Sequence, residues 1–238
     1  DSKGMLRFIH AGNQLTTYPI RDFAQVRTIT SDGRGTMYLS TTDGLVTFSS
    51  RFSNPKEICF YTTKQSVDKS AHLLTADVLQ TMVTKKGEVY VLTLGGGVQR
   101  MTSPTPLADN LTFDILSQFN MEEGRVQAVV EDKDGRLWMF RENSINCYNP
   151  TTDDLLCYGP GVIGEKVELT ESQPIYNAGN NTILVAGYGC FLTFSPDHVK
   201  LSNYKPSIAF TGVQYQGETK RQSIINVKEL EIPSDKRN

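Results

Sequence analysis

The sequence predicts an all-β fold, a partial β-propeller of about four to five four-stranded blades. Three observations support this prediction. One pattern of apolar strands and polar turns occurs four times along the 238 residues. Its repeat length is close to the roughly 40 to 50 residues of a propeller blade. Segments with the apolar spacing of an amphipathic helix are almost absent.

The first turn of each repeat sets the alignment. It aligns Gly35, Gly87, Gly135 and Asn181, at spacings of 52 residues (35 to 87), 48 residues (87 to 135) and 46 residues (135 to 181). Glycine adopts the positive φ of a tight hairpin turn without steric cost, and asparagine is the next most tolerant residue. The acidic residues of these turns are expected to accept hydrogen bonds from nearby amides; they are Asp32, Asp132 and Asp134.

The second strand and the second turn repeat in the same register. The strand position is aromatic in three repeats and aliphatic in the fourth: Tyr38, Tyr90, Trp138 and Leu184. The turn position is glycine in three repeats and serine in one: Gly44, Gly96, Gly189 and Ser144. A single four-stranded blade cannot bury its own faces, so we expect the aromatic side chains to pack one blade against the next.

The repeats predict a propeller segment over residues 1–205, with blades near 26–62, 78–120, 126–159 and 176–200. Residues 1–20 form a partial blade, because Gly4 aligns with Gly44 of a third strand. We therefore expect a longer propeller with more chain upstream, although a second chain or a swapped assembly is another way to close the ring. Residues 206–238 lack the repeat and predict two or three strands of a second small β domain.

Composition narrows the possible partners. The chain has 24 basic and 26 acidic side chains and a net charge of −2, so we expect no nucleic-acid contact. No apolar stretch approaches the roughly 20 residues of a membrane-spanning helix, so we expect membrane contact only through segments outside this chain. The four cysteines form no C-x-x-C pair, and we expect no metal and no cofactor. Cys147 and Cys157 are either free thiols, the simpler interpretation, or a disulfide across a hairpin.

The repeat resembles the two-component regulator propeller repeat, whose pattern is an acidic residue, a turn glycine, an aliphatic–tryptophan pair and a glycine–leucine turn. Asp132, Gly135, Leu137 and Trp138 fit this pattern, as do Asp32, Gly35, Met37, Tyr38, Gly44 and Leu45 with tyrosine in place of tryptophan. The ending Phe194, Ser195 and Pro196, followed by Pro206, resembles the junction where this family leaves its propeller. The resemblance covers nearly the whole chain and departs from the pattern at Lys85, Lys86 and Ser144.

This resemblance implies a periplasmic sensor region of a Bacteroidetes hybrid histidine kinase, with an immunoglobulin-like domain beginning at residues 206–238. It further implies detection of glycan-derived oligosaccharides, a signal relayed to a kinase elsewhere in the protein, and self-association or a homodimer in the full receptor. A propeller scaffold without its own ligand is the alternative. A propeller lyase or glycosidase is a further alternative, but the chain has none of the common catalytic motifs, and we expect no catalytic residues in it.

A sugar site needs aromatic faces and planar polar groups on one rim of the propeller. The turns between second and third strands of successive blades share a rim, and they supply Asp43, Arg141, Glu142 and Tyr188. We expect Arg141 to grip a uronate or sulfate and Tyr188 to stack on a sugar ring. Exposed turns or contacts between blades are the simpler interpretation of these residues.

Overall fold

The computed structural model describes residues 5–9, 15–19, 24–52, 57–62, 72–108, 111–116, 125–142, 144–159, 162, 167–170, 172–199, 211–215, 219 and 222–223. The chain divides into two compact units, Asp1–Val199 and Lys200–Asn238. The domain boundary at 205/206 stays a prediction, because residues 200–210 lie outside the described residues.

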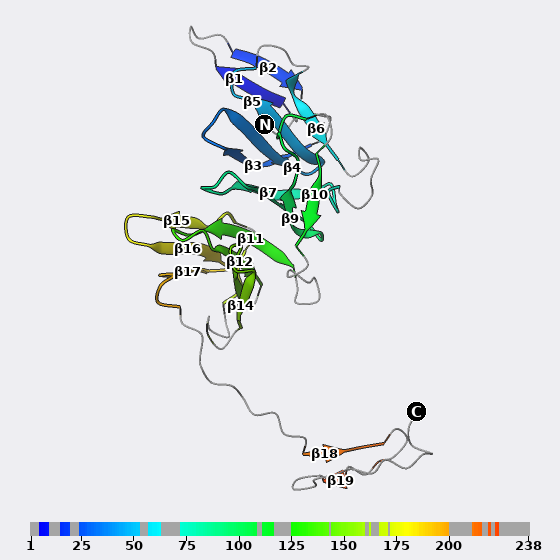
Figure 1. Ribbon diagram of the computed structural model, residues 1–238, viewed down its shortest axis with the longest axis vertical. Helices are drawn as coiled ribbons and strands as arrows, with labels where there is room; N and C mark the ends of the chain where they lie inside the picture. Colours follow the sequence, from blue (N-terminus) through cyan, green and yellow to red (C-terminus); the bar gives the residue numbers. More distant parts are fainter. Residues whose placement is uncertain are drawn as a thin grey trace. The chain divides into compact units, whose positions relative to one another are not determined.

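Four antiparallel sheets form the propeller blades of the first unit, which confirms the all-β propeller fold (Figure 1). Each sheet is a meander in chain order. Blade 1 contains β3 (Val26–Ser31), β4 (Thr36–Thr41), β5 (Gly44–Ser49) and β6 (Cys59–Tyr61). Blade 2 contains β7 (Val78–Val83), β8 (Val89–Thr93), β9 (Gly97–Met101) and β10 (Phe113–Ile115). Blade 3 contains β11 (Val126–Glu131), β12 (Leu137–Arg141), β13 (Ile145–Asn149) and β14 (Asp154–Tyr158).

Blade 4 has three described strands, β15 (Ile175–Asn177), β16 (Thr182–Gly187) and β17 (Cys190–Phe194). A hairpin of β1 (Met5–Ile9) and β2 (Leu15–Pro19) precedes blade 1, in the place of the predicted partial blade. In the second unit, β18 (Gly212–Val213) pairs with β19 (Gln222–Ser223). The immunoglobulin-like identity of this unit stays a prediction, because most of it lies outside the described residues.

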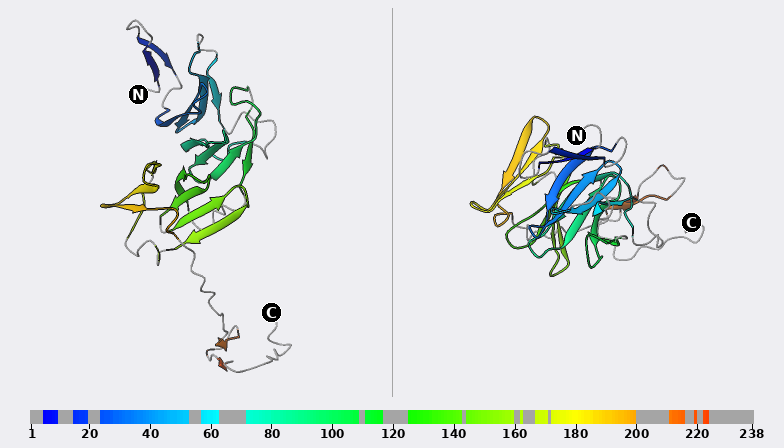
Figure 2. Two further views of the ribbon diagram at one scale, coloured as in Figure 1. Left: turned by 60° about the vertical axis from the view of Figure 1, so that its left-hand side comes forward. Right: turned by 90° about the horizontal axis from the view of Figure 1, so that it is seen from above.

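Successive blades contact one another through their first strands. β3 contacts β7, β7 contacts β11 and β11 contacts β15, so the blades follow one another in chain order (Figures 1 and 2). The aligned turn residues have the predicted positive φ, at 114° for Gly35, 89° for Gly87, 78° for Gly135 and 50° for Asn181. The repeat therefore fixes the hairpin geometry of all four blades.

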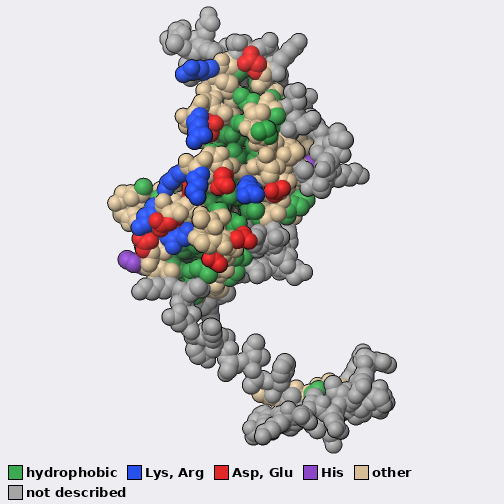
Figure 3. Space-filling model, in the orientation of Figure 1, with side chains coloured by type: hydrophobic (Ala, Val, Ile, Leu, Met, Phe, Trp, Pro, Cys, Tyr) green, Lys and Arg blue, Asp and Glu red, His purple; other side chains and the backbone are tan. Residues whose placement is uncertain are grey.

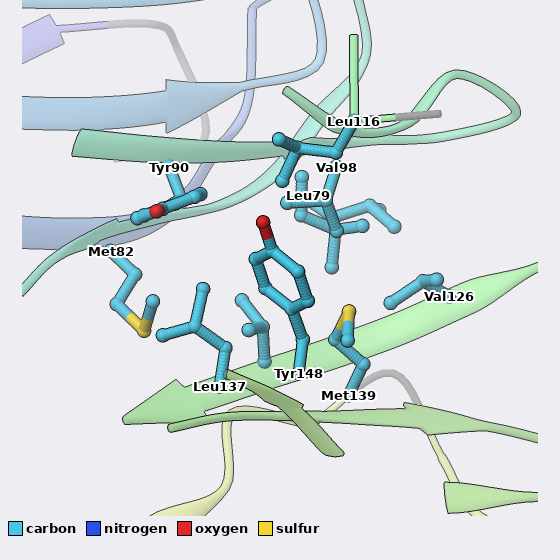
Figure 4. Close-up of a cluster of buried hydrophobic side chains, with 11 residues drawn as sticks. Leu79, Met82, Tyr90, Val98, Leu116, Val126, Leu137, Met139 and Tyr148 are labelled. Atoms are coloured by element: carbon cyan, nitrogen blue, oxygen red, sulfur yellow. The ribbon is translucent and has the colours of Figure 1, made fainter. Parts of the chain in front are cut away.

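The hydrophobic core lies between the blades rather than inside them. Tyr38, Tyr90 and Trp138 are each 1% exposed, which confirms the predicted packing of one blade on the next. Between blades 2 and 3, Leu137 and Met139 of β12 lie in one cluster with Met82 and Tyr90; Leu137 lies beside Met82, and Met139 lies beside Val126 (Figure 4). Equivalent clusters lie between blades 1 and 2 and between blades 3 and 4.

Polar bonds hold the junctions in register. The buried side chain of Gln80 donates to the Val129 carbonyl oxygen at 2.8 Å and accepts from the Val129 amide at 3.0 Å. At the junction of blades 3 and 4, the Asp197 carboxylate accepts from Lys133 at 2.5 Å and lies 3.5 Å from the Arg136 guanidinium. Asn181 also donates to Asp197, at 2.8 Å. The segment that follows β17 is therefore bonded to blade 3 as well as to blade 4.

The four cysteines are free. In the β13–β14 pair, Cys147 lies opposite Leu156 and Cys157 lies opposite Asn146. Neighbouring residues of a strand point to opposite faces, so the two thiols lie on different faces of the sheet and form no disulfide. Within the described part of the chain, no helix has the length and hydropathy to cross a membrane.

Candidate ligand site

The four residues predicted for the rim differ in exposure. Glu142 is exposed, Asp43 is half-buried, and Tyr188 is 74% exposed in the turn between β16 and β17. Arg141 is only 2% exposed. It ends β12 on the same face as Leu137 and Met139, and strand alternation therefore turns its guanidinium into the junction with blade 2. Arg141 therefore lies in a contact between blades, one of the simpler interpretations given above, and not on the open rim where it would grip a uronate or sulfate.

Two of these residues are brought close by a segment that the sequence did not single out. The Leu169 amide donates to the Glu142 carbonyl oxygen at 3.4 Å, and the Tyr188 amide donates to the Glu168 carbonyl oxygen at 2.9 Å. Leu169 is fully buried and anchors this link, whereas the Glu168 side chain is exposed. The rim of blades 3 and 4 therefore presents Glu142, Glu168 and Tyr188, and Asp43 lies apart from them on blade 1.

A groove lies at the opposite ends of the strands, between blades 1 and 2. It has a volume of about 460 Å³ and is lined by the first turns of blades 1 and 2, by strands β4, β8 and β9 and by the connection after β9: Asp32, Arg34, Tyr38, Gly87, Glu88, Val89, Arg100, Met101, Thr102, Ser103, Pro104 and Pro106. We call this pocket the inter-blade groove. None of the rim residues predicted from the sequence lies in it.

The Tyr38 hydroxyl group is a hydrogen-bond donor of the inter-blade groove. The side chain is 1% exposed and lines the groove from β4. Burial, together with the nearby charge of Asp32, raises the pKa of Tyr38 to about 12. Like an ordinary tyrosine hydroxyl group, the Tyr38 hydroxyl group is protonated at neutral pH and can donate to an acceptor oxygen.

Asp32 supplies a negative charge beside Tyr38. Its carboxylate accepts from the amides of Arg34 at 2.7 Å and Thr36 at 2.8 Å, as predicted for an acidic residue of this turn. Burial opposes ionisation, but these backbone hydrogen bonds outweigh it and lower the pKa of Asp32 below 3.8. Asp32 is therefore ionised at neutral pH.

Two guanidinium groups balance the carboxylates of the groove. Arg34 is exposed over the groove, and Arg100 donates to Asp114 at 3.3 Å. This hydrogen bond raises the pKa of Arg100, although burial opposes the shift. Glu88, near the Tyr90 hydroxyl group at 3.5 Å, supplies the second negative charge. Basic and acidic side chains are also interspersed over the face in Figure 3, so neither sign of charge dominates there.

This arrangement can bind a compact, polar, uncharged ligand. Hydroxyl groups both donate and accept, so they can bond to carboxylates, guanidinium groups and the Tyr38 hydroxyl group in one groove. Pro104 and Pro106 add apolar surface to the wall. Within the described residues, no group of three His, Cys, Asp or Glu side chains is placed to hold a metal ion.

No known protein-family profile matches the chain. A histidine kinase of Formosa agariphila, "Histidine kinase P4", is 27% identical over 96 residues, which cover 40% of this chain and 7% of that protein. The extracellular domain of the putative hybrid two-component system BT4673 from B. thetaiotaomicron matches with a TM-score of 0.56 and 18% identity. A luciferin-regenerating enzyme matches with a TM-score of 0.50 and 11% identity, over 79% of this chain and 64% of the enzyme.

The BT4673 match covers 80% of this chain and 23% of the solved domain, so this chain spans less than a quarter of that relative. At these identities the structural matches show the fold, and enzymes share that fold with sensors. The solved neighbours nevertheless include the extracellular domain of a putative hybrid two-component system, BT4673, and the sequence relative is a histidine kinase. In fold, the chain is therefore similar to the extracellular domain of this putative hybrid two-component system.

Proposed function

We propose that this chain is the ligand-sensing propeller of a periplasmic receptor region in a hybrid two-component system. In this proposal it detects glycan-derived oligosaccharides and relays the signal to a histidine kinase elsewhere in the protein. The inter-blade groove is the observation that carries the proposal. It combines two guanidinium groups, two carboxylates and a protonated tyrosine hydroxyl group in a volume of about 460 Å³.

A sugar fits this set of groups for two reasons. Each hydroxyl group of a sugar can satisfy one donor and one acceptor, which suits a groove lined both by Arg34 and Arg100 and by Asp32 and Glu88. The groove also bridges two blades, so a bound ligand would contact both of them and favour one arrangement of the junction. Such a preference for one state is what allows binding to send a signal.

The rim of blades 3 and 4 is a second candidate site. The Tyr188 ring is 74% exposed and can stack on a sugar face, and the exposed Glu142 and Glu168 can accept from sugar hydroxyl groups. The burial of Arg141 leaves this rim without the guanidinium group expected for a uronate or sulfate. We therefore prefer the inter-blade groove. A homodimer in the full receptor stays a separate prediction.

A thermal-shift screen of this chain against oligosaccharides released from complex glycans tests the proposal. A ligand that binds only the folded state raises the melting temperature. The Arg34→Ala variant should weaken binding by about tenfold or more, since a hydrogen bond to a charged group contributes roughly 1.5–3 kcal/mol. Arg51→Ala, which removes an exposed arginine outside the groove, is the matched control and should bind normally.

The outcomes separate the candidate sites. Loss of binding in Tyr188→Ala, with normal binding in Arg34→Ala, would assign the ligand to the rim of blades 3 and 4. If no oligosaccharide stabilises the chain or the full-length protein, the propeller is a scaffold and the sensing proposal is wrong.

A further inference from the structure

A second hollow adjoins the inter-blade groove at Arg34, which lines both. It has a volume of about 560 Å³ and lies between the first turn of blade 1, the turn after β5 and the connection that carries Leu107. We call it the blade 1 pocket. Its lining includes two arginines and three serines: Arg34, Arg51, Ser31, Ser49 and Ser50. The oligosaccharide site proposed above uses only Arg34 of this set, so the other four have no role in it.

Hydrogen bonds hold the walls of the blade 1 pocket together. The two turns are joined directly, because the Ser50 amide donates to the Gly35 carbonyl oxygen at 2.7 Å. The connection that carries Leu107 belongs to blade 2, and it is fastened to blade 1 where the Thr47 hydroxyl group donates to the Pro106 carbonyl oxygen at 2.7 Å. The pocket is therefore a fixed feature of blade 1 and its neighbour, and not a chance gap between loops.

Arg34 and Arg51 bring positive charge to the blade 1 pocket. Both side chains are exposed, and among the described residues neither guanidinium group has a carboxylate partner. The described residues that line the pocket include no acidic side chain. Asp32 belongs to the same first turn, but it lines the inter-blade groove, and its carboxylate accepts from amides of the turn. The two guanidinium groups are therefore available to an anion from solution.

Three serine hydroxyl groups add neutral donors to the same pocket. Ser31 Oγ accepts from the Gly33 amide at 3.1 Å, and Ser49 Oγ accepts from the Arg51 amide at 3.2 Å. In each of these hydroxyl groups the hydrogen remains to be donated, and within the described part of the chain no acceptor takes it. Ser50 supplies a third, exposed hydroxyl group. The pocket therefore offers donors from both of its turns.

We propose that the blade 1 pocket binds a sulfate or phosphate group, either as a free ion or as a substituent of a larger molecule. Guanidinium groups bind such groups through paired, charge-assisted hydrogen bonds, and hydroxyl donors can bond to the remaining oxygen atoms. Arg34 takes part by turning from its place beside Gly87, where an added Cβ would lie 3.2 Å from a guanidinium nitrogen. A neutral sugar in the inter-blade groove needs Arg34 but not Arg51, so this proposal does not rest on the sugar site.

Titration of this chain with sodium sulfate or sodium phosphate tests the proposal, with the NMR signals of the arginine Nε–H groups as the readout. The ionic strength is held constant with sodium chloride, because salt screens exposed charges. The signals of Arg34 and Arg51 should shift and saturate together, whereas that of Arg27, which is paired with Asp77, should not. Arg51→Ala should raise the dissociation constant by about tenfold or more. Lys86→Ala, which removes an exposed cation that lines neither hollow, is the matched control and should leave it unchanged.

Galactose and its sulfate ester identify the source of the bound group. Tighter binding of the ester than of both inorganic sulfate and galactose would show that the group belongs to a sugar, and binding no tighter than that of inorganic sulfate would show that the pocket takes the free ion. Shifts that do not saturate, or an equal loss of binding in Arg51→Ala and Lys86→Ala, would overturn the proposal. Arg51→Ala should still bind neutral oligosaccharides, so failure of the blade 1 pocket is distinguishable from failure of the inter-blade groove.

Discussion

The Asp132→Asn substitution should destabilise the propeller strongly. Asp132 is 0% exposed in the first turn of blade 3. One carboxylate oxygen accepts from the amides of Asp134 at 2.9 Å and Arg136 at 3.0 Å. The other accepts from the Arg136 side chain at 2.7 Å and from the Trp138 indole at 2.8 Å. All four partners are donors, so this site requires a group that only accepts.

Asparagine has nearly the shape of aspartate but cannot meet this requirement. Whichever way its amide is turned, the NH₂ group faces two donors, and two hydrogen bonds are lost. Each hydrogen bond to a charged group contributes about 1.5–3 kcal/mol, and breaking a buried ion pair costs about 3–5 kcal/mol. We therefore expect the free energy of unfolding to fall by about 3–5 kcal/mol for Asp132→Asn.

Urea unfolding, followed by fluorescence of the single tryptophan, measures this loss. Trp138 is buried beside the substitution, so its emission reports on the same junction. Asp134→Asn is the matched control, since this carboxylate is 52% exposed and bonds to Arg136 at 3.2 Å; the expected loss is about 0.5 kcal/mol or less. Similar urea midpoints for the two variants would refute the reasoning, because they would show that the buried acceptor contributes no more than an exposed ion pair.

Three further predictions follow from local geometry. Burial raises the pKa of the Cys147 thiol to about 12, so iodoacetamide at about pH 8 should modify the exposed Cys190 long before Cys147 in the folded protein. Gly44→Ala should lower the free energy of unfolding by more than Gly33→Ala. Both glycines have positive φ, but a Cβ at Gly44 would overlap a carbonyl oxygen of β6, whereas a Cβ at Gly33 would face open space. The urea unfolding midpoints of the two variants measure the difference. Burial raises the pKa of Asp32, but hydrogen bonds from the amides of its own turn lower it further, so the net pKa is lowered. The contribution of Asp32 to stability is therefore present above about pH 4 and is lost as the pH falls through the lowered pKa. Asp32→Asn should flatten the dependence of melting temperature on pH in this range.

The repeat pattern was enough to predict the blades, because each hairpin depends on residues close together in the chain. The sequence predicts the turn roles of Asp32 and Asp132 for the same reason, but it gives no sign of the bond from Trp138 to Asp132. Strand alternation contained the signal that Arg141 is buried, since it follows Leu137 and Met139 at steps of two. Its place at the end of β12, beside a turn, favours exposure and competes with this signal.

The inter-blade groove could not be predicted in this way. Arg34 and Arg100 belong to different blades and lie 66 positions apart in the sequence (34 to 100), and only the packing of blade 1 on blade 2 places them in one groove. The exposure of Leu184 is likewise a property of its neighbours. Its sequence position alone predicts the burial found for Tyr38, Tyr90 and Trp138.

The bonds of Asp197 have a mechanical consequence. This residue lies just before the end of the first unit at Val199, and it is attached to Lys133 and Arg136 of blade 3 as well as to Asn181 of blade 4. Tension on the chain beyond Val199 therefore loads two blades together instead of peeling β17 away from β16 one residue at a time. These bonds are surface ion pairs, which contribute little in water, so they oppose the first step of such peeling without locking the two blades together.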